Sequence, residues 1–100
     1  PGHGTHCAGR VAAVANNSLG IRGVGTGTQL MALKFFYDVG EPNAGTGDDA
    51  AAVRAIDYAI KNGAKIISAS WGGDVPRAEA EKGELKEAIL RAQKAGVLFI

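Results

Sequence analysis

The sequence predicts an α/β chain in which a mostly parallel sheet is doubly wound between two layers of helices, making three layers. Apolar runs of strand length at 29–36, 64–71 and 97–100 are continuous rather than alternating, as in parallel strands buried on both faces. Segments with helical apolar spacing separate them, so the order is strand, helix, strand, helix, strand. Such crossovers are right-handed.

A first helix is predicted from His3 to Ala15, because Val11 and Val14 stand among small residues that suit close packing. We expect this helix to be buried, with its amino end near Gly4. The turn-forming stretch NNSLG ends it. The apolar run QLMALKFF, residues 29–36, is then the first strand, and a long loop follows from residue 37 to residue 47.

A second helix begins after Asp48 or Asp49, either of which can cap it, and ends at Gly63. Its apolar face consists of Val53, Ile56 and Ile60. The run AKIISASW, residues 64–71, is the second strand. A third helix ends at Gly96, and VLFI, residues 97–100, begins the third strand. Its apolar face consists of Leu85, Ala88, Ile89 and Ala92.

Composition bounds the class of protein. The chain of 100 residues is 46% hydrophobic with a net charge of +1 and no basic run, which favours neither nucleic acid nor a membrane as partner. The single cysteine excludes an internal disulfide. The glycines at 23–27 run from a helix into a strand, the reverse of a phosphate-binding loop. Because the chain opens at Pro1 and stops in an apolar run, we expect a piece of something longer.

The carboxyl ends of parallel strands meet at one edge, which places FFYDVGEPNAGTG and SWGG together there. Near the start, His3, His6 and Cys7 leave three hypotheses open. A metal site lacks further ligands. A thiol catalyst is disfavoured, because Cys7 is expected to be buried in the core. A histidine that opens a helix suits a general base, but Ser70 has no G-x-S-x-G motif around it.

The segment HGTHCAG resembles the active-site histidine motif of subtilisin-like serine proteases, the subtilases. Further segments follow in the order that the family has, and together they cover essentially the whole chain. They are NNSLGIRGVG, LMALKFF, GTG, AIDYAIKNGAKIISASWGG and AILRAQKAGVLFI. The resemblance implies a subtilisin-like fold and peptide-bond hydrolysis by a Ser-His-Asp triad.

The resemblance implies roles for particular residues. His3 is the catalytic base and His6 the family's second, non-catalytic histidine. Two segments bind the extended polypeptide substrate as added strands. Their residues are Gly45, Thr46 and Gly47, and Ser70, Trp71, Gly72 and Gly73. Phe36 and Trp71 would line the pocket for the fourth residue before the scissile bond, with packing at the strand ends as the alternative.

The segment ANNSLGI resembles a subtilisin loop that binds Ca²⁺ through oxygen ligands. The implied ligands are the carbonyl oxygens of Ala15, Leu19 and Ile21 and the side chain of Asn17. The chain has one residue more here than the usual pattern, and the remaining ligands would lie upstream of Pro1. Cys7 matches the cysteine of proteinase K-like subtilases, which implies a buried thiol beneath His3.

By the same resemblance, residues 1–100 are the central part of a peptidase domain. The triad aspartate would lie upstream and the serine downstream, so we expect no activity from these residues alone. The resemblance also implies that the parent is secreted, and that the partners of this chain are the missing segments of its own catalytic domain and a pro-segment. The alternative is an inactive subtilase-like module that binds peptides without cleaving them.

Overall fold

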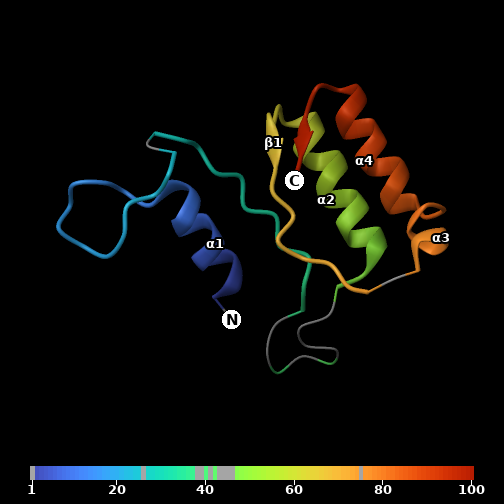
Figure 1. Ribbon diagram of the computed structural model, residues 1–100, viewed down its shortest axis with the longest axis horizontal. Coiled ribbons are helices and arrows are strands. Elements are labelled where there is room, and N and C mark those ends of the chain that lie inside the picture. The colour runs from blue at the N-terminus through green and yellow to red at the C-terminus, as the bar shows by residue number, and fades with distance from the viewer. Residues whose placement is uncertain (1, 26, 38–39, 41, 43–46, 75) are drawn as a thin grey trace. The chain divides into compact units, whose positions relative to one another are not determined.

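The computed structural model describes residues 2–25, 27–37, 40, 42, 47–74 and 76–100. They form two compact units, Pro1–Ala32 and Leu33–Ile100, each of which is described by itself. The first unit contains helix α1, and the second contains the other elements (Figure 1). Within the described residues, no helix has both the length and the apolar character that a membrane crossing requires.

Helix α1 spans His3–Ala12 and begins after Gly2, whose left-handed backbone (φ 99°) suits a glycine. Its last carbonyl groups find partners in the returning chain. The N–H groups of Gly23 and Gly25 donate to the carbonyls of Ala13 and Val11, at 3.0 and 2.7 Å. A side chain at residue 23 would meet the backbone of Ala12 at 2.7 Å, so only glycine allows this close approach.

The predicted burial of this helix is wrong in this structure. No residue of α1 is buried, and Val11 and Val14 are 38% and 69% exposed. The helix also ends at Ala12, three residues before the predicted end at Ala15. Among the described residues of the first unit, no second helix or strand exists to cover its apolar side.

The second unit confirms the predicted ends of two helices. Helix α2 spans Asp49–Lys61, and the Asp48 carboxylate caps it by accepting the Ala51 N–H at 2.6 Å. The chain leaves α2 through Gly63, with φ 78°. Helix α4 spans Glu84–Lys94 and ends before Gly96, with φ 74°. A short helix α3, Arg77–Ala80, was not predicted.

Two short parallel strands, β1 (Ile66–Ile67) and β2 (Leu98–Phe99), confirm the predicted strand direction. Ile66 pairs with Leu98, and Ile67 with Phe99. The Ala69 N–H extends this pairing by donating to the Ile100 carbonyl at 2.7 Å.

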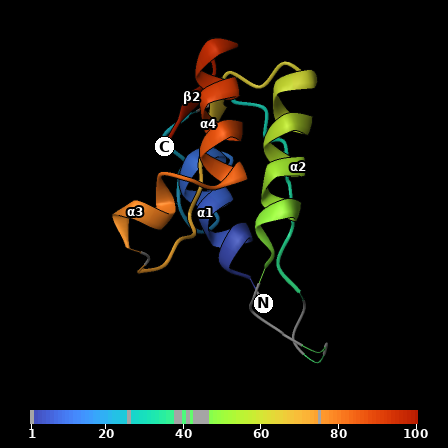
Figure 2. The same ribbon diagram turned by 90° about the vertical axis from the view of Figure 1, so that its right-hand side faces the viewer.

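Helices α2 and α4 lie side by side (Figures 1 and 2) and bury the core. The buried cluster is Ile56, Ala88, Ala92 and Val97, with Val53, Ile60, Ile67, Leu85, Ile89 and Phe99 packed around it. Alanine at the centre of the cluster lets the two helix backbones approach closely. Arg91 on α4 also donates from Nε and one terminal nitrogen to the two carboxylate oxygens of Asp57 on α2, both at 2.9 Å.

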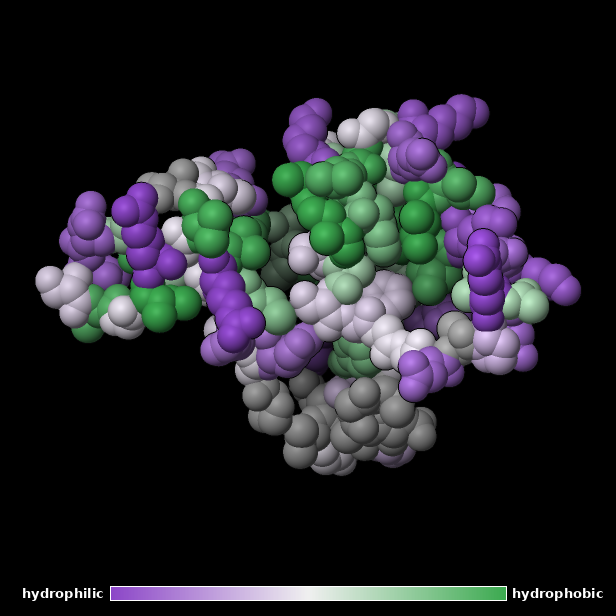
Figure 3. All heavy atoms as spheres, in the orientation of Figure 1, coloured by the Kyte–Doolittle hydropathy of each residue, from purple (hydrophilic) through white to green (hydrophobic). Residues whose placement is uncertain are grey.

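The outer face of the small sheet remains exposed, against the prediction that both faces are buried. Ile66 and Leu98 are 59% and 55% exposed, and Ile100 is 67% exposed. Apolar residues gather over these strands in the space-filling view (Figure 3). The helices that the second unit supplies pack on Ile67 and Phe99, which point the other way.

The predicted strand at 29–36 is also absent. Its residues form no ladder, and only Phe36 makes an isolated antiparallel bridge, with Gly47. Apolar residues in sequence allow an extended chain, but a strand exists only where a neighbouring strand accepts its hydrogen bonds. The described part of the chain places no such neighbour alongside 29–35.

Candidate functional site

His3 is the first residue of α1, and its side chain is exposed. One turn further along, Cys7 Sγ lies 3.7 Å from His3 Nε2. His6 is exposed as well and ties the helix start together through its backbone N–H, which donates to the Gly2 carbonyl at 2.9 Å. An accessible imidazole at a helix start can take up a proton from a reacting group and return it.

Cys7 is half-buried, so the prediction of a buried core thiol is wrong in this structure. The same absence of covering elements that leaves Val11 exposed explains it. The predicted position near His3 does occur, because residues four apart share a helix face. Cys7 is thus half-buried, and its thiol is in contact with the imidazole.

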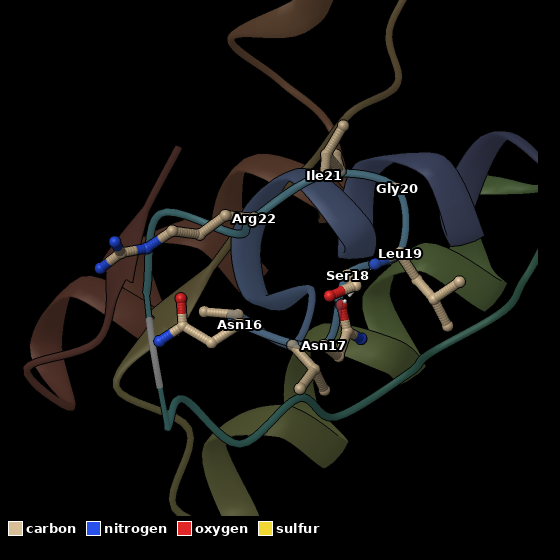
Figure 4. Close-up of a pocket in the computed structure, with 9 residues that line it drawn as sticks. Asn16, Asn17, Ser18, Leu19, Gly20, Ile21 and Arg22 are labelled. Atoms are coloured by element: carbon tan, nitrogen blue, oxygen red, sulfur yellow. Dashed lines mark hydrogen bonds between the residues drawn. The ribbon is translucent and has the colours of Figure 1, made fainter.

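The four predicted calcium ligands, Ala15, Asn17, Leu19 and Ile21, all line one shallow hollow of about 210 Å³ formed by residues 14–22 (Figure 4). The loop coils tightly, with left-handed backbone at Asn16, Ser18 and Gly20. The Asn17 Oδ1 atom accepts the Leu19 N–H at 3.1 Å, which closes an Asx turn. Leu19 and Arg22 point away from the loop on opposite sides (Figure 4).

The ligand atoms that this loop offers are oxygens, which are the atoms that hard cations such as Ca²⁺ prefer. An amide oxygen has two lone pairs, so the hydrogen bond to Leu19 leaves Asn17 Oδ1 able to accept a second partner. Together with backbone carbonyls of the loop, this atom would make a neutral set of oxygen ligands. No group of three His, Cys, Asp or Glu side chains that could hold a metal exists among the described residues.

Aromatic side chains join the predicted substrate-binding residues of the second unit. The rings of Phe35 and Trp71 meet edge to face, with centroids 5.1 Å apart and planes at 78°. The Phe35 and Phe36 rings lie 4.4 Å apart, tilted by 32°. Since Phe36 also bridges to Gly47, three predicted residues, Phe36, Gly47 and Trp71, come together around Phe35. Gly45 and Thr46 lie outside the described residues.

The glycines of the two segments serve different purposes. A Cβ atom at Gly47 would stand 2.7 and 2.8 Å from Phe35 ring carbons, closer than carbon atoms tolerate, so a side chain there would require the Phe35 ring to move. At Gly72 and Gly73 a Cβ would meet nothing within 4 Å. Packing in this unit therefore does not explain why residues 72 and 73 are glycines. They follow the exposed Ser70 and the half-buried Trp71 beyond β1.

Sequence reasoning missed Phe35. In a regular strand, neighbouring side chains point to opposite faces, so a strand with Phe36 at the site would turn Phe35 away from it. No regular strand forms here, so the rings of Phe35 and Phe36 can lie against each other. The adjacent pair of aromatic residues was the available signal.

The model of the subtilase family matches residues 1–100. The chain belongs to the subtilase family. Its α/β character agrees with the parallel pair β1 and β2 and the helices packed on it. The complete three-layer, doubly wound subtilase domain stays a prediction. No solved structure matches the chain.

Several curated relatives of this subtilase are named as proteases. It is 46% identical over 74 residues to thermitase of Thermoactinomyces vulgaris, covering 74% of this chain and 25% of that protein. It is 42% identical over 101 residues to the major intracellular serine protease of Bacillus subtilis, covering 99% and 28%. Subtilisin DY of Bacillus licheniformis is 34% identical over 99 residues, covering 99% and 32%. The subtilase chain thus spans at most about a third of the length of these relatives.

Proposed function

We propose that residues 1–100 are the central part of the peptidase domain of a serine endopeptidase, with His3 as its general base. The observation that carries this proposal is the subtilase match over the whole chain, which includes the histidine motif. The exposed position of His3 at the start of α1 supports it. The aspartate and serine of the triad would come from segments of the parent protein outside these residues, so residues 1–100 alone would be inactive.

In this mechanism His3 takes the proton of the serine hydroxyl while the serine oxygen attacks the carbonyl carbon of the peptide. His3 then gives that proton to the departing amine, which completes acyl transfer to the serine. Water, deprotonated by the same imidazole, then attacks the acyl carbon, and the imidazole returns this proton to the serine oxygen as the ester bond breaks. The aspartate holds the imidazole in the required tautomer and orientation.

The substrate in this proposal is an extended polypeptide that lies between two segments of the chain. Residues 45–47 and 70–73 would hydrogen-bond to its backbone as added strands. The open space around Gly72 and Gly73 supports close approach of a second backbone. Phe36 and Trp71 would line the pocket for an apolar or aromatic side chain four residues before the scissile bond.

The general base is tested by replacing His3 in the parent protein. His3→Ala should lower kcat/KM by about 10⁴-fold or more, because the serine loses its proton acceptor. His6→Ala is the matched control and should keep most activity. If His6 is the indispensable residue, the assignment is wrong. A parent that binds peptides but never cleaves them would instead be the inactive peptide-binding module.

A structural calcium ion is a second part of the proposal. The carbonyl oxygens of Ala15, Leu19 and Ile21 and the side chain of Asn17 would hold it, with further ligands from outside this chain. A bound Ca²⁺ would cross-link the loop that follows α1 and so stabilise the fold. Calcium should raise the Tm of the parent protein but not that of Asn17→Ala, while Asn17→Asp should keep the effect. An equal rise in all three proteins contradicts the site.

Secretion of the parent, with a pro-segment as a further partner of the domain, completes the proposal. One relative is named the major intracellular serine protease, so membership of the family does not by itself place the parent outside the cell. Immunoblots of culture medium and cells, with antibody against this chain, test the location. Finding the mature protein only inside cells would refute secretion.

A further inference from the structure

Phe35 contacts two segments that are distant in sequence, one at Gly47 and one at Trp71. Its ring contacts Trp71 edge to face at 5.1 Å and lies 4.4 Å from the ring of its neighbour Phe36. Its Cδ2 and Cε2 atoms also stand so close to Gly47 that a side chain there would displace the ring. One ring therefore contacts both halves of the predicted peptide-binding edge.

This contact is a surface feature and not part of the main core. Phe35 and Trp71 are half-buried, and Phe36 is 38% exposed. None of the three belongs to the cluster that Ile56, Ala88, Ala92 and Val97 form with their surrounding residues. A change of Phe35 should therefore affect the placement of Trp71 and residue 47 more than the packing of the helices.

The geometry points to Phe35 as a positioning residue that sets which side chain the peptide-binding edge prefers. This inference rests on the proposed function. Phe35 acts through its neighbours. Its edge-to-face contact orients the Trp71 indole. Its contact with Gly47, which forms a bridge with Phe36, sets the distance between that bridge and the segment after β1. Aromatic pairs of this kind favour one relative orientation of the rings. Losing the ring leaves the indole free to turn.

The test compares variants of the parent protein on peptides that carry either an aromatic residue or alanine four positions before the scissile bond. Phe35→Leu removes the ring but keeps an apolar side chain, and Phe35→Tyr restores the ring. The matched control is Phe99→Leu, which removes a half-buried ring from the core of the same unit. The readout is the ratio of kcat/KM for the two peptides, which a general loss of stability leaves unchanged.

We expect Phe35→Leu to lower this ratio by about two- to ten-fold, mainly through KM for the aromatic peptide. Phe35→Tyr should restore it, and Phe99→Leu should keep it while lowering Tm. An unchanged ratio in Phe35→Leu, with active enzyme, overturns the role of Phe35 and leaves the proposed function standing. A parent protein that cleaves none of the peptides overturns the proposed function, and the role of Phe35 with it.

Discussion

Replacing Gly47 by alanine places a methyl group against the Phe35 ring. The added carbon would lie 2.7 Å from Cδ2 and 2.8 Å from Cε2 of Phe35, and 3.3 Å from Cδ1 of Phe36. Ordinary contact between such carbons begins near 3.4 Å, so the Phe35 ring must retreat by roughly 0.7 Å. Because the same ring touches Trp71, the indole loses its edge-to-face partner or moves with it.

The expected change in the free energy of unfolding is small. Losing the aromatic contact costs about 0.5–1.5 kcal/mol. Restricting the unfolded chain by Gly→Ala contributes about 0.4–1 kcal/mol in the opposite direction where the backbone tolerates alanine. Gly47 is not among the glycines with a left-handed backbone, so it does. The two effects nearly cancel, and the unfolding free energy should change by less than about 1 kcal/mol.

The placement of Trp71 should change even though stability does not. We expect Gly47→Ala to alter the near-ultraviolet circular dichroism of Trp71, isolated by difference from Trp71→Phe, and to lower the preference for an aromatic peptide. Gly73→Ala is the control for the spectrum, because a methyl group there meets nothing within 4 Å. The double variant with Phe35→Leu should show less than the sum of the two single effects on preference. Fully additive effects, or a spectrum unchanged from the parent, would show that Phe35 does not connect residue 47 to Trp71.

Two further predictions concern other contacts. A bulky reagent that reacts with the Cys7 thiol should inactivate the parent by crowding His3, whose Nε2 atom lies 3.7 Å from Cys7 Sγ. The Cys7→Val variant should remain active and resist the reagent. Complete loss of activity in Cys7→Val contradicts this prediction. A double-mutant cycle on Asp57→Ala and Arg91→Ala should give a coupling energy below about 1 kcal/mol, because both side chains are nearly half exposed. Urea unfolding of the four proteins measures this energy. A coupling energy well above that value contradicts the expectation.

The helices of the second unit show how much local sequence determines. Asp48 caps α2 and Gly63 ends it, as predicted, and Gly96 follows the end of α4. Their apolar faces, including Ile56 and Ala92, turn inward as their spacing indicated. These features depend on hydrogen bonds and side-chain positions within a few residues, which a sequence displays directly.

In the candidate site, too, the features that depend on local sequence were predicted. The histidine motif, the loop of residues 15–21 and the segments around Gly47 and Trp71 were predicted from residue types and order, and the family match supports that order. The position of Cys7 one turn from His3 followed from helical spacing alone. The roles of these residues in catalysis and binding stay predictions.

Residue order and spacing were enough to predict the family, both ends of α2, the end of α4, the apolar faces of these two helices and the parallel direction of the strands. Only the tertiary structure decided that 29–36 forms no strand, that α1 and Cys7 are not buried, and that Phe35 joins Gly47 to Trp71. The physical reason is common to all three. Strand pairing, burial and ring contacts each need a partner from a distant part of the chain, and an apolar residue in a sequence does not state which partner it will find.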